Sequence, residues 1–294
     1  MRGKTEEEYD VIVVGSGAAG GMCAYVLACS GVRVLMLEAG RDYDPVTETP
    51  MFQLPRDAPL RAAGTPEKPF GFYDATVDGG WRVPGEPYSS ADGADFMWWR
   101  ARMLGGRTNH WGRISLRMGE YDYKPHSRDG LGFDWPMSYE DVAPYYDKTE
   151  MLIGVYGSNE GLENTPNSSP GVLQPPPAPR ATELLTQKVC GDQLDIPVIP
   201  AHLAIMTQRQ EAERLSRALW PNNSLAQRVT SESMRSRASC FYATDCGRGC
   251  SIKANFKWPT VVLTTAKAPG NRAIVKDPGG GAVAGAGRGR GAGG

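Results

Sequence analysis

The pattern of apolar and polar positions near the start of the chain predicts a strand, a helix and a second strand. Residues 11–14 form a continuous apolar run, which is typical of a strand buried on both faces. Residues 18–29 are almost free of charge and predict a helix suited to burial. Residues 32–37 predict the second strand, which ends on Glu38. The pattern indicates an α/β fold with a parallel sheet.

Three glycines at the start of the predicted helix indicate a dinucleotide-binding turn. Gly15, Gly17 and Gly20 give the spacing G-x-G-x-x-G. The first glycine permits a sharp turn, the second lets a pyrophosphate approach the backbone, and the third lets the helix pack close to the strand. Ala18 and Ala19 open the helix, where free N–H groups and the helix dipole favour an anionic diphosphate.

An acidic residue at the end of the second strand completes this pattern. A carboxylate at Glu38 can accept hydrogen bonds from both ribose hydroxyls of an adenosine, and it would repel a 2′-phosphate. Ala39 follows it and is included in the predicted cofactor site. The five features, namely the strand, the glycines, the helix, the second strand and the acid, follow one another at the expected spacing within one unit. This favours a dinucleotide site over a chance Gly-rich turn.

A second stretch, FMWWRARMLGGRTNHWGRISLR at residues 96–117, carries further candidate chemistry. Gly105 and Gly106 would let the backbone press against a flat ligand. Thr108 and Asn109 offer short hydrogen-bonding side chains, and His110 offers a ring. The alternative is a plain glycine turn before a strand, with His110 as a buried structural imidazole.

Later in the chain the pattern predicts several helices and short strands. Residues 134–157 predict a helix with a capping box formed by Ser138 and Asp141, and Pro144 predicts the start of a second helical segment. Tyr145 is expected on the inner face of this helix. The remaining predictions are a helix at 181–194, a short strand at 196–199, a helix at 254–265 and the start of a strand at 272–275.

Composition narrows the class of protein. The chain has 294 residues, 40% hydrophobic content and a net charge of −1, which gives no sign of a nucleic-acid partner. It has no apolar run long enough to span a membrane, and its acidic N-terminus lacks the core of a secretion signal, so we expect a cytoplasmic protein. We expect residues 1–275 to form one partial domain and residues 276–294 to form a disordered, Gly-rich tail.

The six cysteines carry little functional signal. Cys23 and Cys29 lie in the apolar helix and are expected in the core. Cys240, Cys246 and Cys250 have a C-x5-C-x3-C spacing that fits neither a zinc knuckle nor a dithiol motif. Structural thiols are the favoured interpretation, with a disulfide or a metal as alternatives, and no metal site is predicted.

The chain resembles the glucose–methanol–choline (GMC) family of flavoprotein oxidoreductases over residues 8–275. The resemblance rests on GSGAAG with LEAG, RMLGGRTNHWG, DWPMSYEDVAPYYDKTEMLIGVYG and CGRGCSIKANF. It implies a Rossmann-like FAD-binding fold of the GMC type and FAD in place of NAD. The glycines and Glu38 would hold the diphosphate and the adenosine ribose, and the loop from Gly105 through His110 to Gly112 would lie beside the isoalloxazine.

The resemblance also implies an activity and a role for one histidine. GMC enzymes oxidise alcohols or sugars by hydride transfer to flavin N5 and pass electrons to oxygen, a quinone or a cytochrome. GGRTNHW is similar to the pyranose oxidase segment whose histidine is bonded covalently to the flavin, and His110 holds the matching position. Non-covalent contact with the flavin is the favoured alternative, and a plain structural role is the third.

One departure from the family concerns the catalytic residues. Family members are longer, and their catalytic His, with a partner His or Asn, lies near the C-terminus. Nothing here matches that motif, and His126 and His202 are poor substitutes. No catalytic residue is therefore assigned, and we expect a C-terminally truncated, incomplete domain with weak or no turnover. The alternatives are an NAD-dependent Rossmann dehydrogenase and a non-functional truncated gene product.

Overall fold

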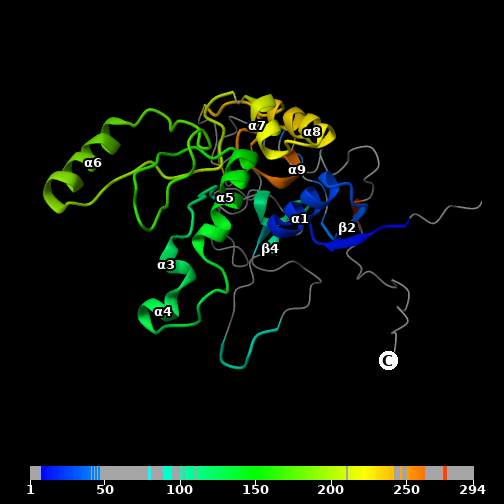
Figure 1. Ribbon diagram of the computed structural model, residues 1–294, viewed down its shortest axis with the longest axis horizontal. Helices are drawn as coiled ribbons and strands as arrows, with labels where there is room; N and C mark the ends of the chain where they lie inside the picture. Colours follow the sequence, from blue (N-terminus) through cyan, green and yellow to red (C-terminus); the bar gives the residue numbers. More distant parts are fainter. Residues whose placement is uncertain are drawn as a thin grey trace, which may run out of the picture.

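A computed structural model describes residues 8–40, 103–109, 111–209, 211–241 and 250–261 of the chain (Figure 1). It also describes short stretches at 42, 44, 46, 79–80, 89–94, 100–101, 246 and 274–276. His110, the predicted disordered residues 277–294 and most of residues 41–99 lie outside the described residues. The same holds for residues 262–265, the end of one predicted helix.

A small parallel sheet organises the N-terminal part of the molecule. Its strands are β1 (Val11–Val14), β2 (Val34–Glu38) and β5 (Ile274–Lys276), in the order β1-β2-β5. β1 runs beside β2 from the pair Val11 and Val34 onwards, and β2 continues beside β5 from the pair Met36 and Ile274. The sheet and the helix between β1 and β2 confirm the predicted α/β fold class in this part of the chain.

The prediction that β1 is buried on both faces is wrong. Val13 is buried, but Ile12 is 59% exposed and Val14 is 80% exposed. Side chains alternate between the two faces of a strand, so one face of β1 packs inward and the other is open to solvent. The apolar sequence alone could not show this, because burial of a face depends on the layer that covers it.

Helix α1 (Ala18–Cys29) has the predicted bounds and packs one face against the sheet. Ala24, Tyr25 and Cys29 are buried, and Tyr25 contacts Trp220 and Thr230 on the side of α7 and α8. Cys23 is exposed, so the prediction that it lies in the core is wrong. Its side chain lies on the part of α1 that neither the sheet nor α7 and α8 cover.

The rest of the described chain is mostly helical. The α-helices are α3 (Glu120–Tyr123), α4 (Pro125–Asp129), α5 (Tyr139–Ile153), α6 (Ala181–Leu194), α7 (Ala212–Leu219), α8 (Ser224–Arg235) and α9 (Trp258–Val261). A 3-10 turn, η3, covers Gly106–Asn109, and a short antiparallel pair joins β3 (Gly79–Gly80) to β4 (Arg100–Ala101). α6 matches its predicted bounds. α9 starts at Trp258, and residues 254–257 are not helical because Asn255 pairs with Ile205, so the predicted start of that helix at 254 is wrong.

Helix α5 confirms the predicted capping box and corrects two details. The Ser138 N–H donates to Asp141 Oδ2 at 2.8 Å, and the Asp141 N–H donates to Ser138 Oγ at 3.4 Å. Pro144 lies inside one continuous helix and does not start a second segment. Tyr145 is 64% exposed, so it does not lie on the inner face.

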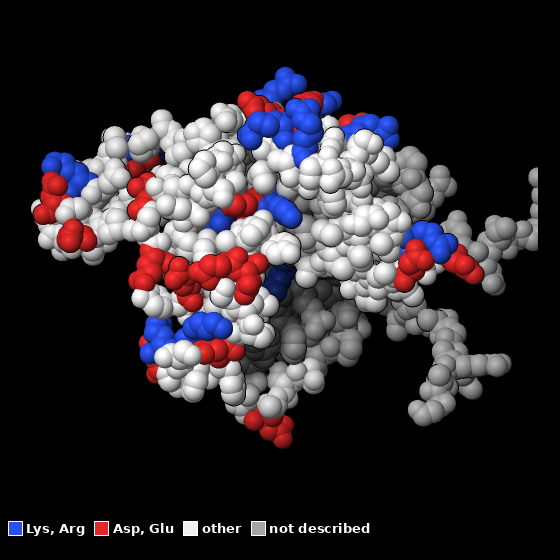
Figure 2. Space-filling model, viewed as in Figure 1, with Lys and Arg blue, Asp and Glu red and all other residues white. Residues whose placement is uncertain are grey.

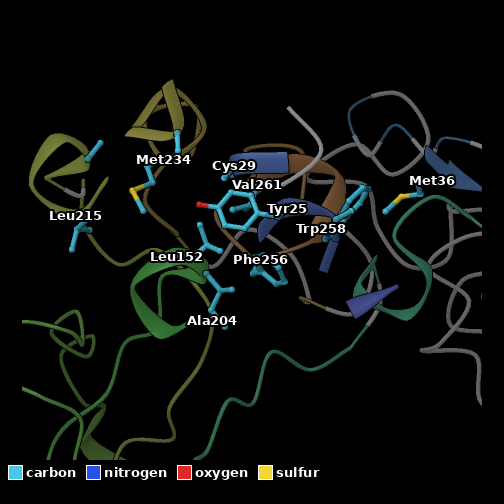
Figure 3. Close-up of a cluster of buried hydrophobic side chains, with 14 of the residues drawn as sticks. Tyr25, Cys29, Met36, Leu152, Ala204, Leu215, Met234, Phe256, Trp258 and Val261 are labelled. Atoms are coloured by element: carbon cyan, nitrogen blue, oxygen red, sulfur yellow. The ribbon is translucent and has the colours of Figure 1, made fainter. Parts of the chain in front are cut away.

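The hydrophobic core joins the sheet and α1 to the helices that follow much later in the chain. Figure 3 shows Tyr25 and Trp258 in the same cluster as side chains of α5, α7 and α8. The Trp220 indole N–H donates to the Tyr25 hydroxyl at 2.6 Å, and that hydroxyl lies 2.9 Å from Thr230 Oγ1. α1 is therefore fixed on α7 and α8 by both apolar and polar contacts.

A buried ion-pair network fixes α5 to the chain on both sides of it. Arg117 donates from Nε to Glu150 Oε1 at 2.9 Å and also pairs with Asp147. Ser168 and Ser169 donate to Glu150 and Asp147 from the following loop. Burial opposes the charge of Arg117, but these carboxylates raise its pKa overall.

Helix α6 stands out from the body of the molecule as an arm (Figure 1). It has no buried residue, and Leu185 on it is 62% exposed. Residues 196–199, where a strand was predicted, return toward the body without strand structure, so that prediction is wrong. A cavity of about 680 Å³ lies between α6 and the two flanking segments, lined by Tyr156 and by residues between 176 and 201.

The described residues contain no membrane-spanning helix, no metal cluster and no disulfide. None of the helices that the structure describes is long and apolar enough to cross a membrane. In the same part of the chain, no cluster of His, Cys, Asp and Glu side chains is arranged to hold a metal ion. All six cysteines are described and no disulfide joins them.

Candidate cofactor site

The turn between β1 and α1 has the shape that a diphosphate site needs. Gly15 has φ +88°, in the left-handed region that favours glycine, and its N–H donates to Leu37 O at 2.8 Å. A Cβ built on Gly20 would lie 2.1 Å from Gly15 O, so α1 and the turn meet where no side chain fits. The turn therefore brings the start of α1 against the end of β1.

The start of α1 presents open backbone. Gly17 is the N-cap residue, with no side-chain hydrogen bond to the cap, and a Cβ built on it would meet nothing within 4 Å. Ala18 and Ala19 follow and are exposed. The first N–H groups of a helix have no acceptor within it, so this end offers donors and a positive partial charge to an anion.

Glu38 lies at the end of β2 beside this turn. Its Oε2 accepts hydrogen bonds from the Ser16 N–H at 2.9 Å and from Ser16 Oγ, and its Oε1 accepts from the Gly40 N–H at 2.7 Å. A carboxylate has about four acceptor positions. Three are used by the protein, so Glu38 is held in place with about one position left for a ribose hydroxyl. Ala39 is exposed next to it.

A second turn, Gly105–Asn109, is held by its own side chains. Thr108 Oγ1 donates to Gly105 O at 2.7 Å, and Asn109 Nδ2 donates to Leu104 O at 2.8 Å and to Gly106 O at 3.0 Å. Gly105 has φ +89°, and a Cβ on it would lie 2.6 Å from Pro259 Cδ. Thr108 and Asn109 are buried, so their side chains build the turn rather than face solvent.

The two turns meet although they are far apart in sequence. The Gly105 N–H donates to Ser16 Oγ at 2.7 Å. A Cβ built on Gly106 would lie 3.4 Å from Gly17 Cα. The structure thus brings together the predicted residues of both motifs, while His110 lies outside the described residues.

Buried positive charge lies behind the second turn. The Arg113 guanidinium is fully buried and donates to Asn109 O at 3.1 Å and Phe256 O at 3.0 Å. The Lys257 side chain is also buried, and burial, followed by repulsion from Arg113, lowers its pKa to about 7. The buried Arg113 guanidinium therefore holds the carbonyl groups of the turn in place, and it could move away only if the core were opened.

Sequence reasoning missed several residues that build this site. Ser16 is fully buried between the glycines, where a single serine gives no pattern signal. Pro259 and Trp258 contact the second turn, and the Trp258 N–H donates to Thr108 Oγ1 at 3.2 Å. Their distance in sequence hides this contact. His126 is exposed on α4 and His202 is buried with Nε2 2.9 Å from Ser158 O, so the two do not form a pair.

The residues present fit a dinucleotide. A side-chain-free approach at Gly17, unpaired helix N–H groups and a fixed carboxylate match a diphosphate next to an adenosine ribose. The fold and the site together define a dinucleotide-binding α/β protein, and the comparisons that follow show that FAD is its cofactor. A family model described as an FAD binding domain matches residues 8–47.

Comparisons with known proteins find similar oxidoreductases. The chain is 32% identical over 164 residues to the fructose dehydrogenase large subunit of Gluconobacter japonicus, covering 54% of this chain and 29% of that protein. It is 32% identical over 200 residues to paromamine 6'-oxidase of Streptomyces fradiae, covering 67% and 31%. It is 31% identical over 148 residues to an oxygen-dependent choline dehydrogenase of Pseudomonas syringae pv. tomato, covering 50% and 23%.

These matches make the chain similar to the glucose–methanol–choline oxidoreductases over the N-terminal, FAD-binding portion of those proteins. The chain spans less than a third of the length of each of these relatives. The family resemblance drawn from the sequence motifs, and FAD as the cofactor, are confirmed.

Proposed function

We propose that this chain is the FAD-binding part of an oxidoreductase that acts on CH–OH groups of alcohols or sugars. FAD supplies the hydride acceptor, flavin N5, when it is bound. The observation that carries the proposal is the meeting of the two turns through Ser16, because it places the Glu38 carboxylate and the Gly105–Asn109 turn at one site.

Each predicted residue then has a task. The backbone of Gly15, Gly17 and Gly20, with the N–H groups at Ala18 and Ala19, holds the diphosphate. The Glu38 carboxylate, next to Ala39, accepts a ribose hydroxyl. The Gly105–Asn109 turn presses its backbone against the isoalloxazine, with His110 following it in the chain. Thr108 and Asn109 keep the turn rigid through their own hydrogen bonds.

The substrate class is proposed from the relatives. Their names give fructose, paromamine and choline as the compounds that they act on. A polyol, sugar or amino alcohol is therefore the substrate class proposed for this site, with a separate electron acceptor. The protein is proposed to be cytoplasmic, with the cofactor domain extending to Lys276 of β5, which pairs with Glu38 of β2, and residues 277–294 as a tail. We expect little alcohol oxidation from the 294-residue chain alone, because neither His126 nor His202 is placed as a proton acceptor.

Titration of the purified chain with FAD, followed by flavin fluorescence, tests the proposal. We expect binding in the wild type, and a loss in Gly17→Val, whose side chain would enter the path of the diphosphate. Glu38→Gln should weaken binding by about 1.5–3 kcal/mol, as expected for the loss of one hydrogen bond to a charged group. Ser30→Ala, which removes an exposed hydroxyl bonded to Val26 O, is the matched control. Tight NADH binding without FAD binding would favour the nicotinamide alternative.

The covalent alternative at His110 has a separate test. If the histidine is bonded to the flavin, the yellow chromophore stays with the wild-type polypeptide through acid precipitation and is released from His110→Ala. Release of the flavin from both proteins would exclude the covalent bond and leave non-covalent contact or a structural role for this residue.

A further inference from the structure

We propose that Ser16 is a positioning residue that couples Glu38 to the Gly105–Asn109 turn, so that the adenosine end and the flavin end of the cofactor site are held as one unit. The proposal rests on the proposed function, since it concerns how the same site holds FAD. It assigns a role to a residue that the glycine motif leaves unspecified.

The direction of each hydrogen bond around Ser16 follows from the chemistry of its partners. The Gly105 N–H can only donate, so Ser16 Oγ accepts from it at 2.7 Å. The single hydroxyl proton then remains for Glu38 Oε2, which also accepts from the Ser16 N–H at 2.9 Å. A carboxylate can only accept, so the order Gly105 to Ser16 to Glu38 has one possible direction.

This chain of hydrogen bonds ends on a charge and is shielded from water. Ser16 is fully buried, and hydrogen bonds to an ionised carboxylate are stronger than those between neutral groups. Successive bonds that point the same way polarise and strengthen one another. The negative charge of Glu38 therefore polarises the Gly105 peptide group through the Ser16 hydroxyl.

The Gly105 turn has little freedom to compensate for a loss of this bond. Gly105 is in the left-handed region at φ +89°, its Cα faces Pro259, and its carbonyl accepts from Thr108. The next residue, Gly106, lies close to Gly17 at the start of α1. A shift of the Gly105 N–H would therefore move the turn relative to the diphosphate site.

Competition binding with the two halves of FAD shows whether Ser16 affects both ends of the cofactor site or only the end next to it. FAD bound to the full chain is displaced by AMP, which occupies the adenosine end, or by FMN, which occupies the flavin end. We expect Ser16→Ala to lower FAD affinity roughly tenfold or more, the loss expected for a charged hydrogen bond, and to weaken both AMP and FMN. Ser16→Thr keeps the hydroxyl and should restore affinity. Ser30→Ala, which removes an exposed hydroxyl at the C-cap of α1, should leave all three affinities unchanged.

A second variant tests the coupling from the other end. In Glu38→Ala the hydroxyl of Ser16 loses its charged acceptor, so FMN binding should weaken several-fold, although Glu38 lies at the adenosine end. Ser16→Ala that weakens AMP alone, or Glu38→Ala that leaves FMN binding intact, would overturn the proposal. If Ser16→Ala does not fold, the FMN measurement on Glu38→Ala decides.

The outcomes also separate this proposal from the proposed function. A wild-type chain without FAD affinity would overturn the function. The coupling would then be tested by denaturation of the wild type, both single variants and the double variant. Coupled residues give a double variant about as stable as the worse single one, whereas additive losses would overturn the coupling.

Discussion

At the scale of single residues, this site is built largely from positions that have no side chain or a very short one. Gly17 leaves space, Gly20 permits contact, and Gly105 adopts a backbone conformation that other residues rarely adopt. The polar side chains around them mostly hold the backbone in place. Substitutions at these glycines should therefore separate effects on cofactor binding from effects on folding.

Gly20→Ala is expected to destabilise the fold. Its Cβ would lie 2.1 Å from Gly15 O, which is backbone and can only move with the turn. A loss of at least about 1–3 kcal/mol of unfolding free energy is expected, as for overpacking in a core. Urea denaturation measures it. Gly191→Ala is the matched helical control, because its Cβ would meet nothing within 4 Å, and alanine should there be neutral or stabilising. Equal effects of the two substitutions would contradict the predicted clash.

Lys257 is expected to make stability depend on pH. Burial, with Arg113 nearby, lowers its pKa from 10.5 to about 7, so between these values the unfolded chain binds a proton that the folded chain does not. This contribution makes folding more favourable as pH rises through that window. Lys257→Met should therefore raise the unfolding free energy more at about pH 6.5 than at about pH 9.5. Lys188→Met, at a side chain 72% exposed, should show no such difference.

Part of the site could be predicted from the sequence, and the reason for the rest is physical. Gly15, Gly20 and Glu38 follow a local spacing along one βαβ unit, which a sequence displays directly. Ser16 gains its importance from Gly105, a partner from a distant part of the chain. Contacts of that kind are set by tertiary packing, and no local pattern records them.

At the scale of elements, the first and last residues of two helices were easier to predict than the neighbours that pack against an element. The helices at Ala18–Cys29 and Ala181–Leu194 have their predicted limits. The predicted burial of β1 and the predicted strand at residues 196–199 are wrong, since each depends on a neighbouring element. Helix α5 continues through Pro144, where the loss of one backbone donor is outweighed by packing and by the capping box at Ser138.

The network around α5 provides a prediction at this scale. Arg117→Met leaves Glu150 buried without its cation and should cost about 3–5 kcal/mol of unfolding free energy. Arg128→Met, which removes an exposed pair with Asp129, should change stability little. Chemical denaturation compares the two, and replacing Glu150 by Leu as well should recover much of the loss at Arg117.

The same network predicts a dependence on acid. Burial raises the pKa of the Asp147 carboxyl, but hydrogen bonds from Ser169 and Arg117 lower it overall. Its stabilising contribution is therefore present above the ordinary value of 3.8 and is lost as pH falls through the lower, folded value. The stability difference between wild type and Arg117→Met should shrink below about pH 4, and a difference that stays constant would contradict the role of Asp147.

At the scale of the whole molecule, the body and the arm differ in how they are stabilised. Acidic side chains gather over α3 and the start of α5, whereas the arm formed by α6 carries charges of both signs, with Lys188 paired to Asp192 (Figure 2). Figure 3 shows that the core lies in the body, between α1 and the later helices. The melting transition should therefore report on the body alone.

Matched leucine substitutions test this division. Leu152→Ala, in the core at 3% exposure, should cost about 2–5 kcal/mol. Leu185→Ala, on the arm, should change the unfolding free energy by about 0.5 kcal/mol or less. Similar losses at both positions, measured by thermal melting, would mean that the arm unfolds together with the core.

The open side of β1 has a consequence for how this polypeptide behaves in concentrated solution. Among the described strands, β1 pairs on one edge only, and its outer face carries Ile12 and Val14. An edge strand with unpaired backbone N–H and C=O groups and exposed apolar side chains is a template for strands from other molecules. The opposite side of the sheet ends in β5, which is unlike β1, so successive additions would be head-to-tail and need not close. The rate at which the solution becomes turbid should therefore rise steeply with protein concentration. The substitutions Ile12→Thr and Val14→Thr should delay the turbidity without lowering the melting temperature.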